Sequence, residues 1–197
     1  MSKKNPNPAG LPPAVQDHDT GLPGVNSNKP AGIFRAVLTA DNHLRLMHDG
    51  SHVRGLDFFQ AARSVIAVAY GYGADVVLNA GDFLNVPESY ALIVDQMLRM
   101  DADLRRMGLP MYVVQGNHDY TTPSWTSVLS TGKENHCGLQ PANGLLPHNK
   151  EILALSFLTP DELRTRLCNL SPAERKAKVL VWHGPVLEFA KFPSENI

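Results

Sequence analysis

Residues 111–119, Met-Tyr-Val-Val-Gln-Gly-Asn-His-Asp, are the most informative stretch of this chain. The first five predict a strand whose apolar run, 111–114, is of the kind found in buried strands, and Gly116 to Asp119 are polar or prone to turns. Packing gives no reason to place an amide, an imidazole and a carboxylate directly behind a buried strand. The stretch therefore predicts a strand that ends in a functional loop.

The same order, an apolar strand followed by polar residues, occurs three more times. The strands are predicted at 33–40, 75–80 and 178–182, and they are followed by Asp41-Asn-His43, Gly81-Asp82 and His183-Gly184. In open α/β sheets the loops at the carboxyl ends of the strands converge on one crevice, where ligands bind. We therefore expect the four polar clusters to meet, although they are far apart in the sequence.

Helical patterns lie between the predicted strands. Apolar spacing predicts a helix over 56–70 and a second from Pro87 to about Met107, whose inward side chains would be Ile93, Met97, Leu98 and Leu104. Capping boxes at Thr159 and Ser171 predict two short helices, and 152–158 predicts another strand. No secondary structure is predicted for 121–150. The alternation of strands and helices favours an α/β fold with a largely parallel sheet.

Composition limits the classes of protein to be considered. A chain of 197 residues with 43% hydrophobic content predicts one globular domain, at 33–197, and the Pro-, Gly- and Asn-rich residues 1–32 predict a disordered arm. The formal net charge of −1 provides no overall positive field for DNA or an anionic membrane.

Cysteine usage and hydropathy bear on location. Cys137 and Cys168 form no CxxC pair, so neither a zinc knuckle nor a disulfide framework is indicated. No apolar stretch has the length of a membrane span, and the N-terminus lacks the apolar core of a signal peptide. We expect a cytoplasmic protein without a membrane partner.

The residue types in the four clusters suit one task. Carboxylate, imidazole and amide donors are typical ligands of manganese, iron or zinc, and the lack of ligating thiols argues against a structural zinc site. Each cluster alone has an ordinary explanation, since Gly-Asp is common in turns and a single histidine after a strand is often only hydrogen-bonded. Four in this arrangement favour a catalytic metal centre.

The ordered motifs D-x-H, G-D, G-N-H-D and a later His resemble those of calcineurin-like metallophosphoesterases, over residues 33–184. Further details are similar to SbcD-type DNA repair exonucleases: Arg54 and Asp57, the segment 81–85, Pro87-Glu-Ser and the segment 108–119. Protein serine/threonine phosphatases are less similar, because they have an Arg soon after the second Asp and a Glu after G-N-H.

The resemblance implies a layered β-sandwich flanked by helices and a two-metal centre. Asp41 and His43 would hold one ion, Asp82 would bridge both, and Asn117 and His183 would hold the second. The expected metal is manganese, with iron, zinc and magnesium as alternatives. Such an ion pair clamps phosphodiester oxygens and activates a hydroxide. His118 would protonate the leaving oxygen, and Asp119 would orient His118.

The family's closing G-H-x-H motif is absent, so we expect an incomplete domain without its C-terminal strands: a fragment, or a chain with a weakened metal centre. Histidines 48, 52, 136 and 148 are interpreted as solvated loop residues. The arginines and lysines at 99, 105, 106, 175, 176 and 178 form only small basic groups.

The expected function is a divalent-metal-dependent DNA exonuclease or phosphodiesterase. DNA and an SbcC-like ATPase would be its partners by resemblance, and the sequence does not indicate an oligomeric state. Two alternatives stay open. One is a phosphomonoesterase or cyclic-nucleotide phosphodiesterase on the same fold, and the other is a non-catalytic scaffold protein that has lost metal chemistry.

Overall fold

A computed structural model describes residues 29–45, 48, 50–85, 90–119 and 137–184 of the chain. Their strands form two sheets. The first is entirely parallel, in the order β1-β2-β3-β4, with β1 Ala36–Thr39, β2 Val76–Asn79, β3 Pro110–Val114 and β4 Gly138–Ala142. In the second, β5 Gly144–Leu145 pairs antiparallel with β6 Ile152–Leu155, and β6 pairs parallel with β7 Val179–Trp182.

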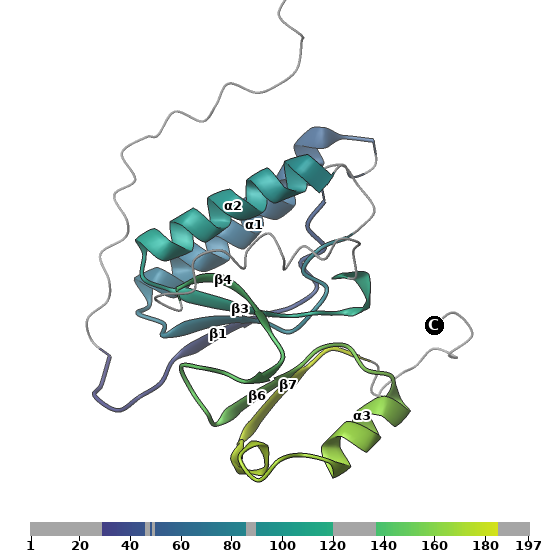
Figure 1. The fold of residues 1–197 in the computed structure, drawn as a ribbon. Coiled ribbons are helices and arrows are strands. Elements are labelled where there is room, and N and C mark those ends of the chain that lie inside the picture. The colour runs from purple at the N-terminus through teal and green to yellow at the C-terminus, as the bar shows by residue number, and fades with distance from the viewer. Residues whose placement is uncertain (1–28, 46–47, 49, 86–89, 120–136, 185–197) are drawn as a thin grey trace, which may run out of the picture.

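Helices cover the outer face of the first sheet. Figure 1 shows α1 His52–Gly71 and α2 Tyr90–Arg106 side by side on one face of this sheet, and the second sheet lies on the opposite face. The third helix, α3 Pro160–Cys168, lies beside the second sheet (Figure 1). This layered mixed α/β architecture with a parallel sheet confirms the predicted fold class.

Two apolar clusters result from the alternation of side chains along the parallel strands. Residues such as Val77 and Met111 pack against Phe59 of α1 and Met97 of α2, whereas their neighbours in the strands face the second sheet. The second cluster consists of Val76, Leu78, Tyr112, Val114, Ala142, Leu146, Ile152, Ala154 and Val181. Because β2 and β3 are buried on both faces, their sequences are continuous apolar runs rather than alternating ones.

Helix α1 begins four residues before the predicted start at residue 56. The side chain of Ser51 accepts a hydrogen bond from the Arg54 backbone N–H at 3.4 Å and caps the helix. The predicted start of the second helix at Pro87 lies outside the described residues, and its end at Arg106 agrees with the prediction.

The prediction that Leu98 faces the core is wrong. Its side chain is 46% exposed, whereas Met97, Met100 and Leu104 of the same helix are buried. These three residues follow one another at helical spacing, and Leu98 lies about 100° around the helix from Met97. Met100, rather than Leu98, contributes its side chain to the core.

The two capping boxes give elements of different length. Thr159 and Glu162 exchange both capping bonds, and α3 follows as predicted. Ser171 and Glu174 also exchange hydrogen bonds, at 2.9 and 3.3 Å, but only a single 3-10 turn, η4 Glu174–Lys176, follows. The expected arm lies largely outside the described residues, although Lys29 within it forms an ion pair with Asp75. Among the helices of the described part, none has the length and apolarity needed to cross a bilayer.

Candidate metal centre

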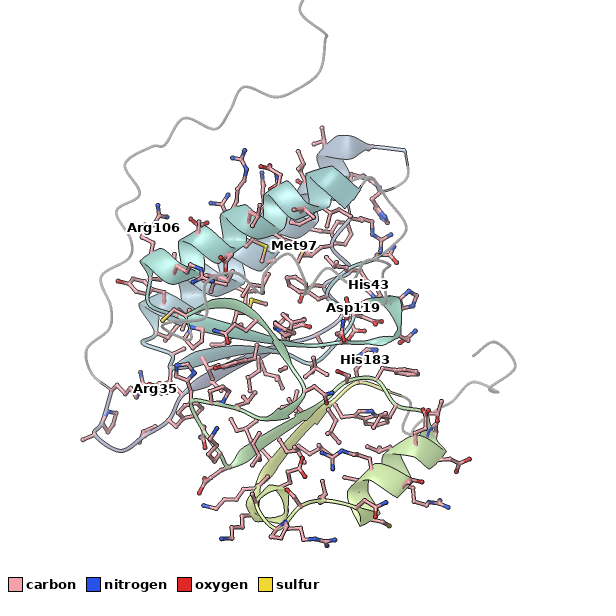
Figure 2. All side chains as sticks on the ribbon, viewed as in Figure 1. Arg35, His43, Met97, Arg106, Asp119 and His183 are labelled. Atoms are coloured by element: carbon pink, nitrogen blue, oxygen red, sulfur yellow. The ribbon has the colours of Figure 1, made fainter. Side chains whose placement is uncertain are left out.

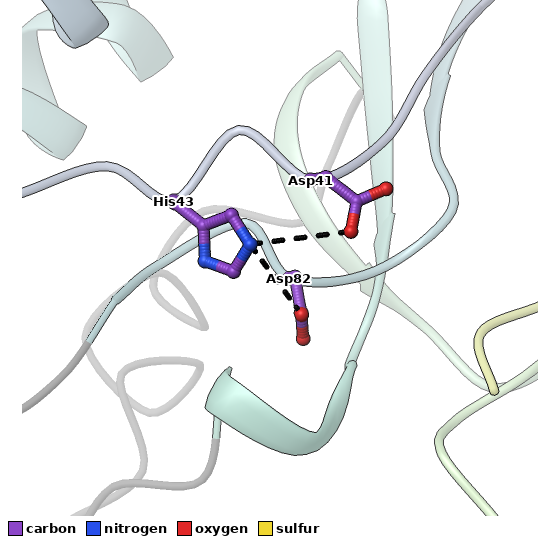
Figure 3. Close-up of side chains that lie close together, drawn as sticks. All are labelled: Asp41, His43 and Asp82. Carbon is purple, nitrogen blue, oxygen red and sulfur yellow. Dashed lines mark ion pairs between the residues drawn. The ribbon is translucent and has the colours of Figure 1, made fainter. Parts of the chain in front are cut away.

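Three predicted metal ligands meet at the ends of β1 and β2. Potential donor atoms of Asp41, His43 and Asp82 all lie within 4.8 Å of one another. The Nε2 atom of His43 lies 4.0 Å from Asp41 Oδ1 and 3.7 Å from Asp82 Oδ2 (Figure 3). The adjacent ends of two parallel strands therefore bring two carboxylates and one imidazole together, as the sequence predicts.

These three residues also share an uncommon backbone conformation. Asp41, His43 and Asp82 have φ angles of 51°, 44° and 50°, and they are the only non-glycine residues with positive φ in the described part of the chain. Non-glycine residues in the left-handed region are uncommon and tend to cluster at functional sites.

Backbone hydrogen bonds between the two loops hold this conformation. The N–H of Asp41 donates to the carbonyl of Gly81 at 3.0 Å, and the N–H of His43 donates to that of Asp82 at 2.9 Å. A third bond follows, from Leu44 N–H to the Phe83 carbonyl at 2.9 Å. Both loops thus extend the contact between β1 and β2 beyond the regular strands.

His183 joins this group from the second sheet (Figure 2). Its Nε2 lies 3.3 Å from Asp82 Oδ2, and its Nδ1 lies 3.1 Å from the Ala80 carbonyl oxygen. Because a carbonyl only accepts, the ring donates through Nδ1–H, and its other nitrogen, Nε2, faces Asp82. A Cβ at Gly81 would lie 2.3 Å from His183 Cβ, so glycine is required beside this ring.

The Gly-Asn-His-Asp loop packs against the other oxygen of Asp82. The backbone N–H of His118 donates to Asp82 Oδ1 at 3.1 Å, and a Cβ at Gly116 would lie 2.2 Å from this oxygen. The rings of His118 and His43 meet edge to face, with centroids 5.3 Å apart. Asn117, the first residue of the 3-10 turn η1 Asn117–Asp119, is exposed beside them.

Asp119 has a role that the sequence analysis did not predict. Its carboxylate is fully buried and accepts three backbone hydrogen bonds, from Phe83, Leu84 and Gly116, at 3.1, 2.7 and 2.7 Å. The pKa of Asp119 is raised above its usual value, mainly because the carboxyl group is buried. The three N–H donors act in the opposite direction, and the charge of nearby Asp82 adds to the rise. Asp119 thus ties the loop after β2 to the loop after β3, and its orientation of His118 stays a prediction.

A second buried polar link, between Asn42 and Asn79, was also missed. Asn79 is completely buried, and its Nδ2 donates to Asn42 Oδ1 at 2.5 Å while its Oδ1 accepts from Gly81 N–H at 3.0 Å. This amide connects the residue next to Asp41 with the residue next to Asp82. The only sequence signal is an asparagine at the end of an otherwise apolar strand.

The arrangement fits divalent metal ions. The donors are carboxylates and imidazoles, which suit borderline cations, and none of them is a thiolate. Asp82 Oδ2 faces two imidazole nitrogens from different sheets, the environment expected of a bridging carboxylate. His43 Nδ1 is buried and has no hydrogen-bond partner among the residues that the structure describes, so the ring makes its polar contacts there through Nε2, on the side of the carboxylates.

Comparison with known proteins agrees with this geometry. The family model for calcineurin-like phosphoesterases matches residues 34–195. Two archaeal proteins named DNA double-strand break repair protein Mre11, from Methanosarcina acetivorans and Methanosarcina mazei, are each 31% identical over 86 residues. The aligned region is 44% of this chain but only 14% of each relative's length.

Proposed function

Because the chain belongs to the calcineurin-like phosphoesterase family, we propose that it is a divalent-metal-dependent phosphodiesterase that acts on DNA. One observation carries the proposal: donor atoms of Asp41, His43 and Asp82 gather within 4.8 Å at the carboxyl ends of neighbouring strands. Ligands bind at this edge in open α/β sheets. The positive φ angles of the same three residues support a functional reason for the arrangement.

The proposed ligand roles are those that the resemblance to the family implies. Asp41 and His43 would hold one ion, Asp82 would contact both, and Asn117 and His183 would hold the second. When bound, a pair of divalent ions supplies Lewis acidity toward phosphoryl oxygens and a hydroxide at neutral pH. We propose manganese as the metal.

His118 is the proposed proton donor. Its side chain is exposed, its ring lies against that of His43, and its backbone N–H is fixed by Asp82. A histidine held at the edge of the centre can approach the leaving oxygen of a bound ester and give it a proton. The buried Asp119 supports this role indirectly, because it fixes the turn that carries His118.

DNA is the proposed substrate because the two relatives are named as DNA double-strand break repair proteins. Their aligned region is less than half of this chain. We therefore also propose, rather than conclude, that the chain acts as an exonuclease, works with an SbcC-like ATPase and is located in the cytoplasm. We also propose that the catalytic domain begins at residue 33.

The test is hydrolysis with added manganese. The purified chain would be incubated with end-labelled linear DNA and, separately, with p-nitrophenyl phosphate and cyclic AMP. We expect DNA cleavage that requires the metal and that falls on the order of 100-fold or more in Asp82→Asn. Asp95→Asn, an acidic residue on α2 paired with Arg99, is the matched control and should retain full activity.

Other outcomes would identify the alternatives. Hydrolysis of only the small esters would replace DNA as the substrate class. Equal activity in wild type and Asp82→Asn would contradict the proposed centre, and metal binding without hydrolysis of any ester would favour a scaffold protein.

A further inference from the structure

Arg45 lies two residues beyond His43 and is fixed in an unusual way. Its Nε donates to the backbone carbonyl of His43 at 3.2 Å. Its guanidinium carbon lies 5.1 Å from the centre of the Phe58 ring, in a cation–π contact. The side chain is therefore held beside the centre by a carbonyl and an aromatic face.

His48 completes the support of this guanidinium. Arg45 Nη1 lies 3.3 Å from His48 Nδ1, and since a guanidinium has only donors, the imidazole accepts this bond. The His48 ring itself packs edge to face on Phe58, with centroids 5.4 Å apart. Backbone hydrogen bonds between His48 and Ser51, at 3.1 and 2.9 Å, attach the cluster to the start of α1.

The charge of Arg45 is not neutralised within the part of the chain that the structure describes. Several arginines elsewhere in this part pair with carboxylates, among them Arg63 with Asp103, Arg99 with Asp95 and Arg166 with Glu174. Arg45 makes no such pair there, and its contacts leave Nη2 available. A planar guanidinium held in this way is suited to bind an oxyanion such as a phosphate.

From this geometry we propose that Arg45 binds a phosphate of a nucleic-acid strand next to the phosphate that is cleaved. The proposal rests on the proposed function, because it assigns the substrate class of the same site. A small ester with one phosphate offers no second phosphate for Arg45 when its own phosphate occupies the metal centre. Arg45 would therefore favour polynucleotides over small phosphate esters without taking part in the chemical step.

The test compares two substrates that differ in the number of phosphates. Manganese-dependent hydrolysis of a fluorescein-labelled thymidine oligonucleotide and of bis(p-nitrophenyl) phosphate would be measured for wild type, Arg45→Gln and Arg45→Lys. Arg106→Gln is the control, because Arg106 lies at the end of α2 remote from His43 and pairs with Asp103 (Figure 2). Thermal unfolding would verify that each variant is folded.

We expect Arg45→Gln to lower kcat/KM for the oligonucleotide about 10-fold, mainly through KM, and to change that for the small diester less than about 2-fold. Arg45→Lys should give an intermediate loss, because it keeps the charge but lacks the planar fork. An equal loss on both substrates would overturn the proposal, since Arg45 would then only support the His43 loop. No loss on either substrate would overturn it too.

Oligonucleotide binding, followed by fluorescence anisotropy over a sodium chloride series, separates this proposal from the proposed function. Arg45→Gln should weaken binding about 10-fold and reduce the slope of log affinity against log salt by about 0.7. If wild type hydrolyses neither ester, the catalytic proposal fails, and anisotropy still decides the role of Arg45. Unchanged binding and salt slope in Arg45→Gln would refute that role.

Discussion

The left-handed backbone conformation of Asp41, His43 and Asp82 lowers the stability of the fold. A non-glycine residue in this region is disfavoured by roughly 1–2 kcal/mol, although Asp and His tolerate it better than most. The Asp41 side chain is 61% exposed, and the ionisable side chain it faces among the described residues is that of His43, whose Nε2 is 4.0 Å from Asp41 Oδ1. Its carboxylate therefore contributes little to folding, and its place is best explained by ligand binding.

This view predicts opposite effects of Asp41→Gly on stability and on metal binding. Glycine adopts positive φ without strain, so the thermal midpoint of the metal-free protein should not fall. Loss of the carboxylate should strongly reduce the rise in midpoint that manganese causes in wild type. Thermal unfolding with and without manganese measures both. A metal-free midpoint several degrees below wild type would show that Asp41 serves the fold rather than the metal.

Asn79 is expected to matter for stability because its amide is buried and links two loops. Asn79→Ala removes the acceptor of the Gly81 N–H and the bond to Asn42, which should lower the free energy of unfolding by about 1–3 kcal/mol. Urea unfolding measures this loss. Asn42→Ala is the comparison, because Asn42 is only half-buried. A larger loss in Asn42→Ala than in Asn79→Ala would contradict the assignment.

At the scale of elements, α3 is joined to the turn η4 through one carboxylate. Glu174 forms an ion pair with Arg166 and accepts from Ser171 N–H at 2.9 Å. The Arg166 side-chain bond, followed by the bonds with Ser171, lowers the pKa of Glu174 to about 2. Since the folded pKa lies below the unfolded one, the resulting stability is present above about pH 4.5 and is lost as the pH falls toward 2.

Glu174→Gln should therefore remove a pH-dependent part of stability. Between pH 6 and pH 2 the urea midpoint of wild type should fall more than that of the variant, so that the two curves converge in acid. The difference between the curves isolates Glu174 from other acidic groups, such as Glu162, whose pKa is also lowered. Parallel curves over this range would contradict the role given to Glu174.

The elements predicted correctly are those whose packing produces a recognisable apolar pattern in the sequence. In helix α1 the pattern is the helical spacing of Phe59, Ala62 and Ile66, and in strand β3 it is a continuous apolar run. Strand β4, Gly-Leu-Gln-Pro-Ala, was not predicted because Gly and Pro are poor strand formers. It occupies the edge of its sheet, where a proline can be tolerated.

The sequence predicted the side chains of the candidate site that stand directly after a strand. It did not predict those that form hydrogen bonds with the backbone of another loop. Asp41, His43 and Asp82 come together because neighbouring parallel strands share one carboxyl edge, and His183 joins them from the end of β7 in the second sheet. The three backbone bonds of Asp119 depend on two loops that are distant in sequence, and no local pattern encodes them.

For the whole molecule, the position of the centre between the two sheets is the main consequence. The loops after β1, β2 and β3 come from the first sheet, whereas His183 follows β7 of the second. Metal binding would therefore tie the two sheets together at one end of the sandwich. A ligand that binds only the folded state stabilises it by about 2.7 kcal/mol at 100 times its Kd.

Isothermal titration calorimetry of the metal-free chain with manganese tests the central claim most directly, because it depends on no substrate. We predict saturable binding that is lost in Asp82→Asn, reduced in His183→Ala and unchanged in Asp95→Asn. Absence of binding to wild type, or equal affinity in wild type and Asp82→Asn, would contradict a metal centre at these strand ends.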